Sequence, residues 1–170
     1  MKRSANDRKT GRPFAVPNLD ERLTPAERLY RKRLLALINE TSRPVAAGEA
    51  VSGTGLEPEE CEKLSRSLEA KGILARSGGE VAFVYPVSAL PTSHRVLLAD
   101  GRTFYAMCAI DALGAGFEFD RDAVVNSSCS HCRRPLTVTL AGGRLQSADP
   151  PDIQVLHVDL DRYRDWAASC

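Results

Sequence analysis

Hydrophobic residues between positions 24 and 41 recur at the spacing of an amphipathic helix. The expected helix begins at Thr24, whose side chain can cap it, with Pro25 in the first turn and Glu27 placed to complete a capping box. Its apolar stripe consists of Ala26, Tyr30, Leu34, Leu37 and Ile38. The segment 39–44 is predicted to end this helix.

Two further helices follow in the same part of the chain. A short one is expected over residues 45–51, and a longer one over 58–71 ends at Gly72. In the longer helix an apolar stripe includes Cys61, which is therefore predicted to be a core residue rather than a reactive thiol.

The pattern then changes to short apolar runs separated by turn residues, which is typical of β-strands. Hairpins are predicted over residues 73–84 and 94–105, and a short helix follows the second hairpin directly. The remaining expected elements are strands at 123–127, 136–140, 144–146 and 153–158, and a final helix at 160–169.

These elements predict an α+β protein. Three helices followed by a hairpin resemble a winged-helix unit with its wing, and a small mixed or antiparallel sheet with short helices completes the chain. The expected division is a flexible basic arm at 1–22, the winged-helix-like unit at 23–84 and a second domain at 85–170, whose first residues, 85–92, form a linker.

Composition and charge exclude several functional classes. With 170 residues, 43% hydrophobic and 26% charged, the chain is typical of a soluble globular protein, and it has neither a run of about 18 apolar residues nor a secretory signal. We therefore expect a cytoplasmic protein without membrane contact. Residues 1–43 carry eleven Lys and Arg against five Asp and Glu, but the helix at 58–71 is acidic, which makes nucleic-acid binding unlikely.

Candidate chemistry lies in the helix after the second hairpin. Cys108 and Asp111 are three residues apart, so in a helix they share a face and can address one ligand. The preceding Asp100-Gly101 turn places Cys108 near the helix start, where a thiol pKa is lowered. Gly114 is predicted to end the helix at its C-terminus.

The run from Arg102 to Leu113 resembles the signature of organomercurial (alkylmercury) lyases, a Tyr-Ala-aromatic-Cys-Ala-x-Asp segment in which Met107 here replaces tryptophan. The spacing from Cys108 to Cys129, followed by 135–138, is also similar to that family. The resemblance extends over about residues 24 to 170.

This resemblance implies an activity and its residues. Cys108 and Cys170 would be the thiols that capture mercury, and Asp111 would donate the proton that releases the hydrocarbon and would contact the metal. The resemblance implies an organomercurial substrate, no organic cofactor, and Hg(II) as the product ion. Cellular thiols or a mercuric reductase would accept that ion. It also implies that the N-terminal unit is mainly structural.

A second group of thiols lies at Cys129-Ser130-His131-Cys132. A Cys-x-x-Cys pair is typical of half a zinc site, which needs two further ligands. Possible further ligands are Cys108, Cys170, His157 and His94. Cys132 is also a candidate metal-relaying thiol, whereas His131 and His157 are expected on the surface or in a strand.

These cysteines support an alternative hypothesis. The protein would then be a non-catalytic winged-helix regulator or a metal-storage module, and Cys108, Cys129, Cys132 and Cys170 would bind Zn(II) or Hg(II). The basic N-terminal segment motivates this hypothesis. So does the absence of the Phe-Cys and His-Phe-Phe sequences that surround the corresponding cysteine in the family that the chain resembles.

Overall fold

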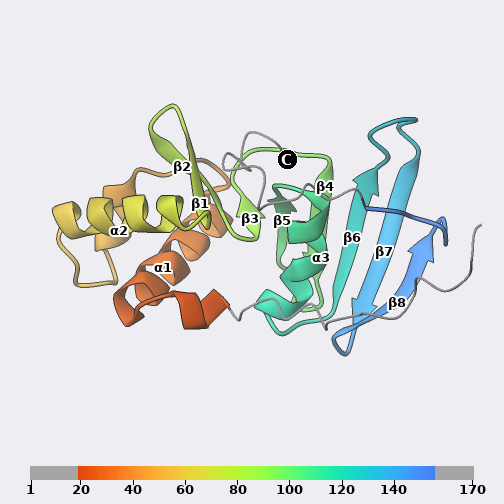
Figure 1. Ribbon diagram of the computed structural model, residues 1–170, viewed down its shortest axis with the longest axis horizontal. Coiled ribbons are helices and arrows are strands. Elements are labelled where there is room, and N and C mark those ends of the chain that lie inside the picture. Colours follow the sequence, from red (N-terminus) through yellow and green to blue (C-terminus); the bar gives the residue numbers. More distant parts are fainter. Residues whose placement is uncertain (1–18, 156–170) are drawn as a thin grey trace, which may run out of the picture.

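The computed structural model describes residues 19–155 of the chain (Figure 1). Cys170, His157, the predicted final helix and most of the predicted N-terminal arm lie outside the described residues. Within residues 19–155, no helix is both long enough and apolar enough to cross a bilayer.

The helices of the first half begin and end close to their predicted positions. A 3₁₀-helix, η1 (Leu19–Arg22), precedes α1 (Pro25–Thr41). The predicted capping box is confirmed, because the Glu27 amide donates to Thr24 Oγ1 at 3.2 Å and the Thr24 amide donates to the Glu27 carboxylate at 2.7 Å. The next two elements are η2 (Ala47–Val51) and α2 (Pro58–Ala70).

All strands of the described chain belong to one antiparallel sheet of eight strands, in the order β1-β2-β3-β5-β4-β6-β7-β8. Their bounds are β1 (Leu74–Ser77), β2 (Glu80–Val84), β3 (Val87–Ser88), β4 (His94–Leu98), β5 (Thr103–Ala106), β6 (Ala123–Ser128), β7 (Pro135–Ala141) and β8 (Arg144–Asp149). The α+β class and both predicted hairpins are therefore confirmed. Residues 153–155 form no strand, in contrast to the prediction for 153–158.

The winged-helix prediction is not confirmed. The hairpin β1–β2, predicted to be a free wing, pairs with β3 through Val84 and Val87, and β3 pairs with β5. The sheet thus continues across residue 85, and the segment predicted as a linker contains a strand. Strand pairing between distant segments is a long-range property, which explains why a local pattern did not show it. The domain division remains a prediction.

One helix, α3 (Ala109–Glu118), lies against β4, β5 and β6 in the middle of the molecule (Figure 1). It continues four residues beyond Gly114, so the predicted C-terminal cap at that glycine is wrong. A Cβ atom at position 114 would clash with the Tyr85 hydroxyl oxygen. The glycine therefore serves the close approach of Tyr85 to the helix rather than the helix end.

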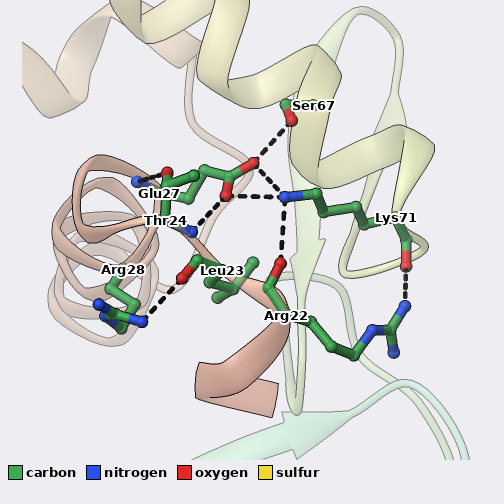
Figure 2. A network of polar contacts seen from close by, with 7 residues as sticks. All are labelled: Arg22, Leu23, Thr24, Glu27, Arg28, Ser67 and Lys71. Carbon is green, nitrogen blue, oxygen red and sulfur yellow. Dashed lines mark hydrogen bonds and ion pairs between the residues drawn. The ribbon is translucent and has the colours of Figure 1, made fainter.

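A buried carboxylate joins α1 to α2 (Figure 2). Glu27 is 3% exposed and accepts hydrogen bonds from Lys71 Nζ at 2.6 Å and 2.7 Å and from Ser67 Oγ at 2.6 Å. Burial alone raises the pKa of Glu27, but the bonds from Lys71, Ser67 and Thr24 outweigh it and lower the pKa to about 2. Cys61 of α2 is fully buried in the core, as predicted.

Candidate functional site

A pocket of about 500 Å³ opens at one end of the sheet, where β4 begins, β5 has just ended and the β6–β7 hairpin turns. Residues from four segments of the chain line the pocket, and they include two cysteines and two histidines. The lining residues that carry polar or reactive groups include Cys108, Cys129, His94, His131, Ser127 and Arg133. Apolar lining comes from Ile110, Leu113, Val125, Leu136 and Val138.

Cys108 occupies the N-cap position of α3, close to where the sequence predicted it. Its backbone is extended and its carbonyl accepts the amide of Ala112 at 3.0 Å, so the residue stands at the junction of strand and helix. The side chain is half-buried and lines the pocket. A thiol at this position lies at the positive end of the helix, where an anionic sulfur is stabilised.

Asp111 lies one turn further along α3 and is 7% exposed. It is not among the residues lining the pocket. Its charge acts on Tyr85: burial raises the pKa of Tyr85 to about 12, and the negative charges of Asp111, Glu118 and Cys108 contribute to the increase. Cys108 and Asp111 therefore both influence Tyr85 electrostatically.

Arg31 holds Tyr85 and α3 together from the side of α1. It is 3% exposed, donates to the Tyr85 carbonyl at 2.6 Å and forms an ion pair with Glu118 at 2.7 Å. Its guanidinium also lies 5.9 Å from the centre of the Tyr85 ring. The buried guanidinium therefore connects α1 to both the backbone carbonyl and the ring of Tyr85.

His94 and Ser127 form a polar pair on the pocket wall. Nδ1 of His94 lies 2.8 Å from Ser127 Oγ, across the neighbouring strands β4 and β6. Burial lowers the pKa of His94, so its ring is neutral at pH 7. A neutral imidazole presents an acceptor or a donor but no charge to a ligand in the pocket.

Cys129 and Cys132 lie in the turn between β6 and β7. The turn is closed by the Cys129 amide, which donates to the Arg134 carbonyl at 2.9 Å, and by the Arg133 amide, which donates to the Cys129 carbonyl at 2.9 Å. Hydrogen bonds from the backbone amides of Cys132 and His131, and then from the Cys132 side chain, lower the pKa of the Cys129 thiol. Cys129 is half-buried and lines the pocket, whereas Cys132 is exposed.

Two of the predicted site residues in the described chain line the pocket, and two do not. Cys108 and Cys129 meet at the same pocket, with Asp111 buried behind it and Cys132 on the outside. Among residues 19–155, no three His, Cys, Asp or Glu side chains form a group that could hold a metal ion. This part of the chain thus offers no support for a zinc site shared by Cys108, Cys129 and Cys132. Cys170 lies outside it.

Sequence reasoning missed Tyr85, Arg31 and Ser127. Tyr85 falls in the segment predicted as a linker, and neither Tyr85 nor Arg31 belongs to a motif with a known spacing. Ser127 could have been found only by pairing the predicted strand at 94–99 with the strand at 123–127. His131 is exposed, as predicted, but it also lines the pocket.

Residues 87–170 match the family model described as alkylmercury lyase. A solved structure, the crystal structure of the mercury-bound form of MerB2, is similar with a TM-score of 0.55 and 21% identity over 74% of this chain and 67% of that chain. At this identity the likeness shows a shared fold. No curated protein matches the sequence.

Proposed function

Because residues 87–170 belong to the alkylmercury lyase family, we propose that this protein cleaves the carbon–mercury bond of organomercurials by protonolysis. The observation that carries the proposal is the Cys108-x-x-Asp111 pair, held at the start of α3 beside a pocket of about 500 Å³. A pocket of this size accommodates a small organic group.

In the proposed reaction, the sulfur of Cys108 bonds to the mercury of R–Hg–X and displaces X. Thiolates are the preferred ligands of soft metal ions. A second sulfur, for which Cys170 is the candidate, adds electron density to the metal and weakens the carbon–mercury bond. Asp111 transfers a proton to the carbon, the bond breaks, and R–H leaves while Hg(II) stays on sulfur.

Burial supports the role of Asp111 as proton donor. A carboxyl that is 7% exposed is largely separated from bulk water, which limits loss of its proton to solvent. Asp111 lies one turn along α3 from Cys108, whose side chain lines the pocket. The apolar lining and the uncharged His94 ring make the pocket compatible with an uncharged hydrocarbon group.

Hydrocarbon release tests the proposal. Purified, reduced full-length protein is incubated with phenylmercury and an excess of a monothiol, and benzene is measured by gas chromatography. We expect catalytic benzene release by the wild-type protein and none above the thiol background by Cys108→Ser. Replacement of the buried core thiol, Cys61→Ala, is the matched control and should retain release in the protein that remains folded. Release by Cys108→Ser equal to wild type would refute the proposal.

A further inference from the structure

The Cys129–Cys132 turn is the feature that the proposed reaction leaves unused. Its two thiols lie within one tight turn, and the Cys132 side chain hydrogen-bonds to the Cys129 sulfur. Zinc needs four ligands, and no third His, Cys, Asp or Glu of residues 19–155 joins these two. A pair of thiolates suits a soft cation of low coordination number, such as Hg(II).

The turn is built to hold a metal-bound sulfur in place. Backbone amides of His131 and Cys132 donate to the Cys129 sulfur, and the main-chain bonds between Cys129 and residues 133 and 134 close the loop around it. Amide donors to a ligating sulfur orient it and stabilise its negative charge. The site is therefore organised before any ion arrives, which reduces the entropy cost of binding.

The position of the turn relates it to Cys108. Cys108 and Cys129 line the same pocket, and exposure increases from these half-buried residues to the exposed Cys132. An ion that moves from Cys108 to Cys129 and then onto Cys132 moves from the pocket toward solvent. Two thiols in one turn also hold an ion more strongly than separate thiols do, because the second bond is intramolecular.

We propose that Cys129 and Cys132 form a dithiol site that takes Hg(II) from Cys108 after cleavage and presents it at the surface. This inference rests on the proposed function. The step is a ligand exchange without redox change: Cys129 and Cys132 each form a mercury–sulfur bond, and the two previous ligands, Cys108 among them, leave. The protons lost by the incoming thiols balance those taken up by the departing thiolates.

The first experiment tests the dithiol site with inorganic Hg(II) alone. Full-length protein carrying Cys108→Ser and Cys170→Ser retains only Cys61, Cys129 and Cys132 as thiols. One equivalent of Hg(II) is added in the presence of glutathione, the complex is weighed by native mass spectrometry, and free thiols are mapped by alkylation. We expect one Hg(II) per chain, with Cys129 and Cys132 protected together.

When Cys132→Ser is added to this variant, its retention of Hg(II) in competition with glutathione should weaken on the order of 100-fold. Ser130→Ala alters the same turn but keeps both sulfurs, so it should not weaken retention. Equal loss of Hg(II) from the Cys132→Ser and Ser130→Ala proteins would overturn the dithiol site. Protection of Cys61 in place of the pair would do the same.

The second experiment tests the transfer in the wild-type protein. After one equivalent of phenylmercury has reacted, alkylation should find Cys108 free and the Cys129–Cys132 pair protected, and in Cys132→Ser it should find Cys108 protected. Cys108 protected in the wild type after benzene release would refute the transfer. Benzene measured in the same sample tests the proposed cleavage separately. If no benzene forms but Hg(II) is retained in the first experiment, cleavage and transfer are refuted and the dithiol site is supported.

Discussion

At the scale of single residues, the proposed chemistry depends on how differently Cys108 and Asp111 of α3 are exposed. Cys108 is half-buried and lines the pocket, so a ligand can reach its sulfur, while Asp111 is 7% exposed and lies outside the lining. A nucleophile needs access, whereas a proton donor benefits from separation from water. Helix α3 meets both requirements: its N-cap residue, Cys108, lines the pocket, and Asp111, one turn later, is buried.

Asp111→Asn tests the proton donor. The amide keeps the shape of the carboxyl but cannot donate the proton, so benzene release in a single turnover should fall by about 10²- to 10⁴-fold. Binding of phenylmercury to Cys108, measured by thiol titration, should persist. Asp120→Asn, in the exposed turn that follows this helix, is the control and should leave release unchanged. Normal release by the Asp111 variant would remove this residue from the mechanism.

Gly114→Ala tests the contact between Tyr85 and α3. Alanine is favoured over glycine in a helix by about 1 kcal/mol, but the added Cβ meets the Tyr85 hydroxyl, and such overpacking costs about 1–3 kcal/mol. The free energy of unfolding, from urea denaturation, should therefore fall by about 1 kcal/mol. Tyr85→Phe removes the hydroxyl, so the double variant with Gly114→Ala should recover the lost free energy of unfolding. A stabilised Gly114→Ala protein would show that the contact is absent.

At the scale of elements, each helix is fixed by a polar contact that its own sequence only half specifies. The capping box of α1 is local, and the sequence pattern predicted it. The same Glu27 carboxylate also receives Lys71 and Ser67 from the end of α2, which is a tertiary contact (Figure 2). One carboxylate thus starts a helix and joins it to a second one, so its loss affects both.

Glu27→Gln should lower the free energy of unfolding by about 2–3 kcal/mol at pH 7, because it leaves Lys71 without its buried partner. Folding lowers the pKa of Glu27 from 4.5 to about 2, so the contribution is complete above pH 4.5 and is lost as the pH falls toward 2. The difference between wild type and variant should shrink over that interval in urea denaturation.

Glu40→Gln is the matched control for this pH profile. Glu40 is an exposed residue of the same helix, 3.9 Å from Arg33, and its replacement should change stability by less than about 0.5 kcal/mol at any pH. A constant difference between the wild type and Glu27→Gln from pH 7 to pH 3 would contradict the assigned network.

At the scale of the whole molecule, one sheet and one buried arginine connect the two halves of the chain. The sheet continues from β2 through β3 into β5 (Figure 1). Arg31 of α1 forms an ion pair with Glu118 of α3. Arg31, from the part of the chain that precedes the matched family segment, thus contacts both Tyr85 and Glu118. That residues 24–84 are mainly structural remains a prediction.

Arg31→Met tests this connection. Removing one partner of a buried ion pair should lower the free energy of unfolding by about 3 kcal/mol, whereas Lys32→Met on the exposed face of the same helix should have little effect. In a double-mutant cycle with Glu118→Gln, the two losses should not add, because each variant removes the same pair. Strict additivity would contradict a direct coupling between α1 and α3.

The sequence by itself determined the features that depend on near neighbours. The capping box at Thr24, the hairpins, the helix start at Cys108 and the core position of Cys61 all follow from spacing and turn chemistry within a few residues. The Cys108–Asp111 pair and its family resemblance are equally local, and the family model confirms that resemblance over residues 87–170.

Only the tertiary structure decided which distant residues meet. It joins the expected wing to the main sheet, sets Tyr85 against Gly114, brings Arg31 to Glu118 and places Cys129 at the pocket of Cys108. These contacts arise from strand pairing and close packing between segments far apart in the chain. Their free energy depends on the whole fold, so no local pattern of residues encodes them.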